Sequence, residues 1–349
     1  MKPISDAFLV VMAGGSGTRF WPKSTSKHPK QLLSFGQGTS LLTQTLNRFE
    51  GLIPPTQKWI VTTKSLTSAI QDDSPGVQIL SEPQGRNTAP CVYWAAREIA
   101  KKNPKGIMLV MPSDHTIPQL EKFKKTVSDA IAWAQSHDDL VTLGIKPDRP
   151  ETGYGYLKFG VSVGSGAYRV DSFVEKPNLD KAKEFLKAGN FYWNGGMFVW
   201  RVDVILRAFD QYAPEMKKIW DANHEKVEAA YPHMTATSID YAVMEKASNV
   251  TAFPLDCGWD DLGSWTSLEN LGELLGAKKD SSVVMAGDLI SIESTQNIID
   301  AQGKLVALLG IQDLIVVHHG DVILVARKDR AQDIKLVVEQ VKKLRPGLA

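Results

Sequence analysis

Short apolar runs alternate with segments of helical periodicity over the first 150 residues of the chain. The apolar runs are too short for helices, so they predict buried strands at 7–12, 58–62, 78–81, 106–111 and 140–144. Apolar positions at helical spacing predict helices at 41–49, 89–102 and 122–136. Strand and helix in turn indicate an α/β fold, with a Rossmann-like, mostly parallel central sheet between two layers of helices.

The pattern changes twice after residue 150. Apolar positions predict packing helices at 203–209 and 215–230. From about residue 281 we expect short strands at 282–285, 289–293, 305–309, 314–318 and 322–326, followed by a basic amphipathic helix at 330–344. We therefore predict two domains, a large one at 1–280 and a small β-rich tail at 281–349 that ends in a helix.

Composition narrows the class of protein. Of the 349 residues, 43% are hydrophobic and 23% are charged, which is near the average for globular proteins. The formal net charge of +1 gives no electrostatic reason to expect a nucleic acid or an anionic membrane as partner. The two cysteines, Cys91 and Cys257, form no metal-binding pattern. No apolar stretch has the length of a membrane span or the form of a secretion signal, so we expect a cytoplasmic protein.

A glycine-rich loop follows the first predicted strand, and its residues without a Cβ are Gly14, Gly15 and Gly17. Backbone N–H groups in such a loop can approach a ligand closely. Arg19 and Lys30, which follow, are both suited to bind phosphate. The loop lacks the G-x-x-x-x-G-K-[ST] spacing of ATPase phosphate loops, and Phe20 stands where a dinucleotide fingerprint needs its third glycine. A tight turn between a strand and a helix is the alternative interpretation.

Two further polar segments follow predicted strands, where ligands bind in parallel α/β sheets. The first begins with Glu82, whose carboxylate can accept hydrogen bonds from the N1–H and the exocyclic amine of guanine. The alternative is a capped helix start, with Thr88 as the cap. The second segment contains Asp114, an acid at a strand end that would ordinarily cap a turn. We expect its neighbour His115 to have a structural role.

We interpret the following part of the chain as a substrate-binding portion. A turn at 153–156 would let backbone groups face a sugar. Glu175 and Lys176 stand side by side, and because successive strand side chains point to opposite faces, both can serve one ligand only if the next residue, a proline, stops the strand. Asn194 precedes an apolar strand expected at 197–200. An exposed ion pair and a simple turn are the alternatives for these residues.

Together these segments resemble the signature of the sugar-1-phosphate nucleotidyltransferases. The run GGSGTR in the glycine loop and the run PKQL around Lys30 match this family, and PKQL and EPQGRNTAP are similar to its mannose-1-phosphate guanylyltransferase branch. In DCGWDDLGSW the family pattern W-x-D-x-G corresponds to Asp261. Two positions depart from the family: Asp260 replaces a small polar residue, and Gly195 stands where serine is more common.

The resemblance implies that GTP and mannose 1-phosphate give GDP-mannose and pyrophosphate by direct in-line attack, on a nucleotidyltransferase domain with a small β-helix-like tail. It implies Mg²⁺ as cofactor, held by Asp114 and Asp261. The implied catalytic residues are Arg19, Lys30, Asp114 and Asp261. The implied nucleotide-binding residues are Ala13, Gly14, Gly15, Gly17, Thr18, Glu82, Arg86, Asn87, Thr88 and Ser113. The implied sugar-phosphate-binding residues are Gly153, Tyr154, Gly155, Glu175, Lys176 and Asn194.

Other interpretations stay open beside this one. A glucose-1-phosphate uridylyl- or thymidylyltransferase would keep the chemistry and change the substrates. A regulatory subunit would bind a sugar nucleotide without converting it, although the four implied catalytic residues are all present. We expect small molecules as partners, and because a tail of this kind exposes strand edges, we also expect a homodimer.

Overall fold

The computed structural model describes residues 3–15, 17–36, 38–279 and 281–349, so Ser16 of the glycine loop lies outside the described residues. The chain divides into two compact units, each made from several segments. The first unit consists of Met1–Gly14, Thr45–Ser113 and Gln119–Trp259, and the second of Gly15–Gln44, Asp114–Pro118 and Asp260–Ala349. The domain boundary at residue 280 stays a prediction.

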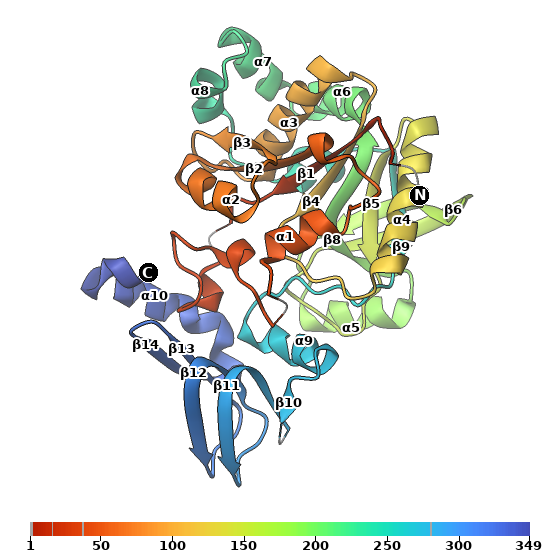
Figure 1. Cartoon of the computed structure of the whole chain (residues 1–349). Coiled ribbons are helices and arrows are strands. Elements are labelled where there is room, and N and C mark those ends of the chain that lie inside the picture. The colour runs from red at the N-terminus through yellow and green to blue at the C-terminus, as the bar shows by residue number, and fades with distance from the viewer. Residues whose placement is uncertain (1–2, 16, 37, 280) are drawn as a thin grey trace. The chain divides into compact units, whose positions relative to one another are not determined.

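A nine-stranded sheet forms the centre of the first unit (Figure 1). Its strands are β1 (Ala7–Met12), β2 (Lys58–Thr63), β3 (Gln78–Glu82), β4 (Ile107–Pro112), β5 (Leu140–Ile145), β6 (Tyr156–Gly164), β7 (Ala167–Val174), β8 (Phe191–Arg201) and β9 (Val250–Leu255). Their order is β3-β2-β1-β4-β8-β5-β9-β7-β6. The first four in this order run parallel, as do β5 and β9, whereas β8 is antiparallel to β4 and β5. The five strands predicted before residue 150 are confirmed.

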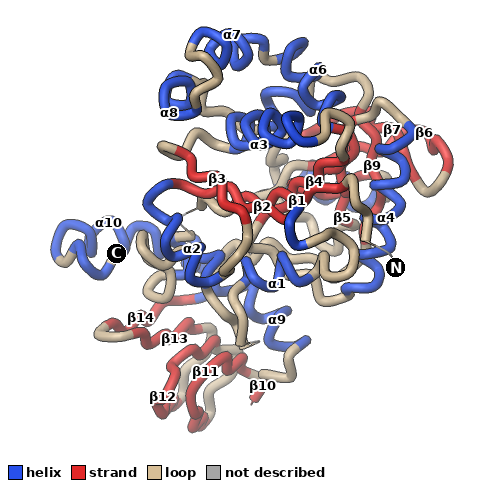
Figure 2. Tube along the Cα trace, turned by 45° about the horizontal axis from the view of Figure 1, so that its top comes forward, coloured by secondary structure: helices blue, strands red, loops and turns tan. Residues whose placement is uncertain are grey.

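Helices of the first unit cover both faces of this sheet, as predicted (Figure 2). They are α2 (Thr67–Asp73), α3 (Thr88–Lys102), α4 (Leu120–Ser136), α5 (Leu179–Ala188), α6 (Val202–Tyr212), α7 (Pro214–Ala222) and α8 (Val227–Ala230). Val10 and Val110 belong to the apolar core that contains α3 and α6. Their strand neighbours Leu9 and Leu109, which point to the opposite face, are equally buried. Helix α1 (Leu41–Asn47) spans the division between the units.

The single helix predicted at 215–230 is wrong, because the chain forms α7 and α8 there with a turn between them. In this turn His224 and Glu225 have φ angles of 54° and 58°, which a right-handed helix does not contain. The apolar periodicity continues across the turn although the helical backbone does not.

The strand predicted at 197–200 starts earlier, at Phe191, so that Asn194 lies inside β8 and not in a turn before it. The pairing of β8 with β5 is irregular between Thr142 and Gly144, and Gly196 has a φ of 63°. Such a bulge reorients side chains within a strand. Asn194 and the glycines after it therefore occupy a distorted part of β8.

The second unit contains a five-stranded sheet in the order β10-β11-β12-β13-β14, where β10 is Lys278–Lys279, β11 is Ser282–Ile292, β12 is Ile298–Leu309, β13 is Leu314–His319 and β14 is Val322–Arg327. The strands predicted at 282–285 and 289–293 are one strand, β11, with irregular pairing around Gly287. A Cβ at Gly287 would lie 2.3 Å from the carbonyl oxygen of Ala301. Parallel pairing of β11 with β12 and of β12 with β13 suits a β-helix-like tail.

Helices α9 (Leu268–Leu274) and α10 (Ile334–Leu344) complete the second unit, and α10 confirms most of the helix predicted at 330–344. One apolar core joins the segment after the glycine loop to the tail. It contains Phe20 and Trp265 together with Ile298, Ile334 and Val338. Among the described helices, none has the length and apolar character needed to cross a membrane.

Candidate active site

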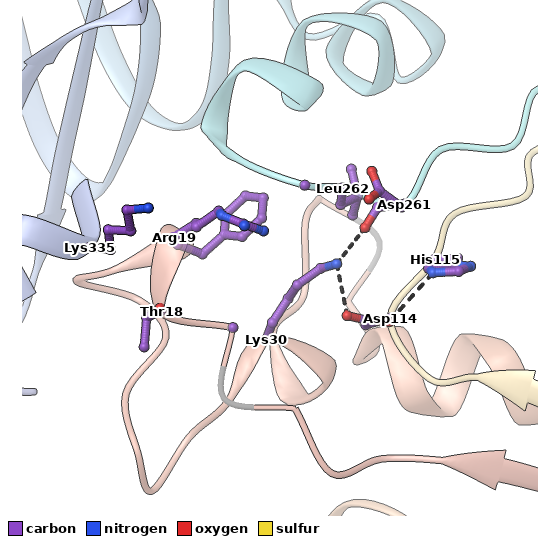
Figure 3. Close-up of a pocket in the computed structure, with 11 residues that line it drawn as sticks. Thr18, Arg19, Lys30, Asp114, His115, Asp261, Leu262 and Lys335 are labelled. Atoms are coloured by element: carbon purple, nitrogen blue, oxygen red, sulfur yellow. Dashed lines mark hydrogen bonds and ion pairs between the residues drawn. The ribbon is translucent and has the colours of Figure 1, made fainter. Parts of the chain in front are cut away.

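A cavity of about 380 Å³ lies within the second unit (Figure 3). This volume is typical of small-molecule sites. The cavity lining includes Arg19, Lys30, Asp114 and Asp261, the four residues that the family resemblance implies as catalytic. These residues come from three segments that are far apart in the sequence, so the tertiary fold brings them together.

Gly17 allows the glycine loop to pass close to Lys30. A Cβ at Gly17 would lie 2.2 Å from the Cβ of Lys30, and the φ of Gly17 is 58°. No L side chain fits this contact, and few adopt this conformation. The loop continues as a short 3-10 helix, Thr18–Phe20, in which Phe20 is buried and Arg19 is exposed. This anchoring leaves the Arg19 guanidinium at the cavity.

Lys30 is buried between two acidic residues (Figure 3). Its Nζ lies 2.9 Å from Oδ2 of Asp114 and donates a second hydrogen bond to the main-chain carbonyl of Asp261. Desolvation acts to raise the pKa of Asp114, but the Lys30 ammonium and the His115 imidazole outweigh it and hold this pKa below its usual value. Asp114 is therefore a carboxylate at neutral pH, with part of its side chain open to solvent.

The adjacent acids Asp260 and Asp261 have different surroundings. Oδ1 of Asp260 accepts a hydrogen bond of 2.7 Å from the N–H of Leu262, and Asp260 is buried. Its main chain forms an isolated bridge with Thr116. Asp261, in contrast, lines the cavity. Asp260 therefore stabilises the turn, and of the two acids Asp261 is the one that lines the cavity.

Glu82 ends β3 in the first unit and is 4% exposed. The hydroxyl of Tyr231 donates a hydrogen bond to Oε1 of Glu82, while Oε2 would lie 3.5 Å from a Cβ at Gly14. Desolvation raises the pKa of Glu82, and the hydrogen bond from Tyr231 partly opposes this rise. Glu82 is therefore a pre-oriented carboxyl group beside the start of the glycine loop.

The polar residues after Glu82 all have protein partners. Arg86 donates to the carbonyl of Pro232. Asn87, not Thr88, is the N-cap of α3, since its side chain accepts a hydrogen bond of 2.8 Å from the N–H of Thr88. The predicted cap at Thr88 is wrong because Thr88 is already helical, and its hydroxyl accepts instead from the N–H of Ile239, at 2.8 Å. These contacts tie the segment to residues 232–239.

A second polar cluster of the first unit contains Gly155, Glu175 and Asn194. A Cβ at Gly155 would lie 2.9 Å from Oε2 of Glu175 and 3.7 Å from the Cβ of Asn194. The side-chain amide of Asn194 donates to Oδ1 of Asp240 at 2.7 Å, and its oxygen accepts from the N–H of Gly196 at 3.2 Å. Desolvation raises the pKa of Asp240, the bond from Asn194 opposes this, and the charge of Glu175 adds to the rise. This group of carboxylate and amide oxygens is suited to bind sugar hydroxyls.

Lys176 lies at the edge of this cluster. Strand β7 ends at Val174, as the following proline predicted, and Lys176 has a φ of 39°. Its Nζ lies 2.9 Å from Oε1 of Glu175, and both side chains are open to solvent. A positive φ at a residue other than glycine is strained and is often found at functional sites.

Other implied residues have partners within the protein. Ala13 and Ser113 are buried, and their N–H groups donate to the carbonyls of Val61 and Met12. The N–H of Gly153 donates to Glu151 at 2.9 Å. Tyr154 packs edge-on against Trp193 and Trp259. These positions shape the strand ends and the turn at 153–156.

Two family models match the chain. The first, described as nucleotidyl transferase, matches residues 9–278, which is more than half of the chain. The chain belongs to the nucleotidyl transferase family. The second model, described as a MannoseP isomerase/GMP-like beta-helix domain, matches residues 287–341 and confirms the β-helix-like tail.

Three known proteins resemble the chain over most of its length. A mannose-1-phosphate guanylyltransferase of Escherichia coli is 36% identical over 356 residues, covering 95% of this chain and 75% of that protein. The xanthan biosynthesis protein XanB of Xanthomonas campestris is 38% identical over 353 residues, covering 97% and 74%. A crystal structure described as a mannose-1-phosphate geranyltransferase from Thermus thermophilus matches with a TM-score of 0.89 and 31% identity, covering 97% of this chain and 99% of that one. The chain is thus a nucleotidyltransferase, and the family resemblance predicted from the sequence is confirmed.

Nucleotidyltransferases of this family generally use a divalent metal ion, and the cavity has suitable ligands. Asp114 and Asp261 supply carboxylate oxygens from two segments that line the same space. Magnesium commonly takes one or two protein carboxylates and completes its shell with water and substrate phosphates. The described residues contain no cluster of three or more His, Cys, Asp or Glu that could hold a metal. A metal at Asp114 and Asp261 would therefore depend on phosphate oxygens for further ligands.

The structure adds four residues to those expected of a nucleotidyltransferase. His115 and Lys335 line the cavity of the second unit, whereas Tyr231 and Asp240 contact Glu82 and Asn194 in the first. His115 has a place in the implied motif, but its role there was expected to be structural. The others lie in or next to helices without a recognisable motif, so their distance in sequence from their partners concealed them.

Proposed function

We propose that this nucleotidyltransferase is a mannose-1-phosphate guanylyltransferase, which converts GTP and mannose 1-phosphate into GDP-mannose and pyrophosphate with Mg²⁺. The observation that carries the proposal is the cavity in which Arg19 and Lys30 stand beside Asp114 and Asp261. Two cations and two carboxylates in one small space suit polyphosphate with a divalent metal.

The reaction requires alignment and charge neutralisation more than proton transfer. An oxygen of the sugar phosphate attacks the α-phosphorus of GTP, the bond from this phosphorus to the bridging oxygen breaks, and pyrophosphate leaves. A phosphate monoester has a second pKa of about 6, so the attacking group is mostly dianionic at neutral pH. The nucleophile therefore needs no general base. What it needs is cationic groups that reduce its repulsion from the triphosphate.

Each residue of the cavity has a distinct part in this scheme. The guanidinium of Arg19 and the ammonium of Lys30 bind phosphate oxygens of GTP, together with N–H groups of the glycine loop. Asp114 and Asp261 hold Mg²⁺, which when bound supplies positive charge at the transferring phosphate. Lys30 also positions these acids, because its Nζ contacts the carboxylate of Asp114 and the main-chain carbonyl of Asp261.

The base and the sugar are recognised by residues of the first unit. Glu82 accepts hydrogen bonds from the N1–H and exocyclic amine of guanine and repels the acceptor at N1 of adenine. The buried contact between Glu82 and Tyr231 supports this role, because it leaves the second carboxylate oxygen of Glu82 on the side of Gly14. Glu175 and Asn194 bind mannose hydroxyls, with Asp240 fixing the amide of Asn194, and Lys176 binds the sugar phosphate. The homodimer and the cytoplasmic location stay predictions.

Pyrophosphate release tests the proposal directly. The protein is incubated with Mg²⁺ and mannose 1-phosphate, with GTP, ATP, UTP or dTTP in parallel. We expect release with GTP far above that with the other three. Release with UTP or dTTP instead would favour a uridylyl- or thymidylyltransferase, and the same assay with glucose 1-phosphate would test the choice of sugar. No release with any nucleotide, despite nucleotide binding, would contradict the proposed reaction.

A further inference from the structure

A lysine of the tail lines the same cavity as the four implied catalytic residues. Lys335 is the second residue of α10 and is exposed. Figure 3 shows it on the same side of Lys30 as Arg19, with His115 on the other side. The tail therefore supplies a third cation to a cavity otherwise formed by the glycine loop and the segments around Asp114 and Asp261.

The position of Lys335 is fixed by its neighbours in the helix. Ile334 and Val338, which lie on one face of α10, are 2% and 3% exposed and belong to the same apolar core as Phe20. Helix α10 also contacts the short helix Thr18–Phe20. Because Phe20 follows Arg19 directly, this packing holds the start of α10 near Arg19. The cavity thus contains two cations on neighbouring, jointly anchored elements.

Lys335 is poorly placed for the stability of its own helix. A cation in the first turn of a helix is opposed by the positive end of the helix dipole. The N-cap acid Asp333 is paired with Arg330, and the first turn of α10 contains no acidic residue. Lys335 makes no ion pair or hydrogen bond with any residue that the structure describes. An anion bound in the cavity would compensate both the charge of Lys335 and the dipole. A nucleotide triphosphate is such an anion.

We propose that Lys335 binds the outer phosphates of the nucleoside triphosphate and the pyrophosphate that leaves, which makes the tail part of the substrate site. This inference rests on the proposed nucleotidyl transfer. We expect the reacting α-phosphorus to lie next to Asp114 and Asp261, the two residues that would hold the metal. Lys335 lies with Arg19 on the other side of Lys30 (Figure 3). In-line displacement sends the leaving group away from the attacking sugar phosphate. Lys335 therefore acts on the leaving group and not on the sugar.

The test compares Lys335→Ala, Lys335→Gln and Lys335→Arg with a control on the same helix, Lys342→Ala. Lys342 is exposed in the last turn of α10 and does not line the cavity. In the reverse reaction we expect Lys335→Ala and Lys335→Gln to raise the KM for pyrophosphate about three- to tenfold, the range for an exposed charged contact with phosphate. The KM for GDP-mannose should stay within about twofold, and Lys335→Arg should restore most of the affinity, since it keeps the charge.

Equilibrium binding of magnesium pyrophosphate should weaken by the same factor, whereas thermal unfolding of the ligand-free protein should be unchanged or shift slightly upward, because Lys335 opposes the helix dipole. An unchanged KM for pyrophosphate in Lys335→Ala and Lys335→Gln, or an equal rise in Lys342→Ala, would overturn the proposal. Binding of magnesium pyrophosphate needs no nucleotide. The binding measurement therefore tests Lys335 even if the wild-type enzyme prefers a nucleotide other than GTP, an outcome that would defeat only the proposed base specificity.

Discussion

The cavity of the second unit and the polar clusters of the first unit use charged residues in opposite ways. In the cavity, Lys30 holds the pKa of Asp114 down, and Arg19 and Lys335 make no ion pair with described residues. In the first unit, desolvation raises the pKa of Glu82 and of Asp240, and each accepts a hydrogen bond from a neutral side chain. The cavity thus presents net positive charge, whereas the clusters present oriented acceptors.

Under the proposed function, this difference corresponds to two tasks in nucleotidyl transfer. Phosphates are the same in every nucleotide, so a site for them needs positive charge but little discrimination. A base and a sugar differ from their analogues in single donors and acceptors, and buried, oriented partners penalise the wrong analogue most. Substitutions in the cavity should therefore reduce turnover for all substrates. Substitutions in the clusters should change the choice among substrates.

The largest effect should come from the adjacent acids of the cavity. We expect Asp261→Asn to reduce kcat by about 10²–10³, the usual cost of removing one group that stabilises a transition state. Asp260→Asn is the matched control, because an asparagine oxygen can still accept from the N–H of Leu262. Steady-state kinetics with circular dichroism would check both variants. Equal losses in the two, or near-normal turnover in Asp261→Asn, would contradict the assignment of Asp261.

Much of the fold could be predicted because its strands are short, continuous apolar runs. The run at 7–12 matches β1, and the parallel strands beside it were recognisable in the same way. The break between α7 and α8 was not predictable from periodicity, since apolar positions recur on both sides of it. The choice of Asn87 over Thr88 as the cap was equally hidden, because both residue types cap helices well.

The candidate site could be predicted where its residues form contiguous motifs. Arg19, Lys30, Asp114 and Asp261 belong to such motifs, and the structure places them around one cavity. Tyr231, Asp240 and Lys335 act on or beside these motifs from distant helical segments. Only tertiary packing brings them there, as the shared core of Ile334 and Phe20 shows for Lys335.

A smaller loss of turnover should follow from Gly17→Ala. The added Cβ would meet the Cβ of Lys30 and would occupy a backbone conformation with φ of 58°. We expect kcat to fall about ten- to hundredfold for every nucleotide, because Lys30 is displaced from Asp114 by roughly an ångström. Gly51→Ala is the control, since Gly51 has a similar φ of 73° but a Cβ there has no atom within 4 Å. If kinetics and thermal unfolding show both variants to be alike, close contact at Gly17 does not position Lys30.

In the first unit, Glu82→Gln should change preference and not turnover. Glutamine can still accept from Tyr231 but no longer offers two oxygens to guanine. We expect the ratio of kcat/KM for GTP to that for ATP to fall about tenfold, the value of one hydrogen bond to a charged group. Glu228→Gln, an exposed glutamate paired with Lys64, is the control and should leave this ratio unchanged. A wild-type ratio in Glu82→Gln would exclude Glu82 from base recognition.

The smallest effect we expect is a shift with pH in Tyr231→Phe. The hydrogen bond from Tyr231 lowers a pKa of Glu82 that desolvation has raised, so its removal should raise this pKa further. Under the proposed function, the carboxylate is the form of Glu82 that binds guanine. Preference for GTP is therefore retained above the pKa of Glu82 and lost as the pH falls through it, and Tyr231→Phe should move this loss to higher pH.

Binding of GTP and ATP measured between about pH 5 and pH 8 would reveal this shift, since the ratio of the two affinities cancels the titration of their common phosphates. Phenylalanine keeps the ring that packs edge-on against Trp94, so the variant removes only the hydroxyl. In Glu82→Gln the ratio should not depend on pH. If wild type and Tyr231→Phe lose GTP preference at the same pH, the hydrogen bond from Tyr231 does not lower the pKa of Glu82. The first unit would then select the base by shape and not by an oriented charge.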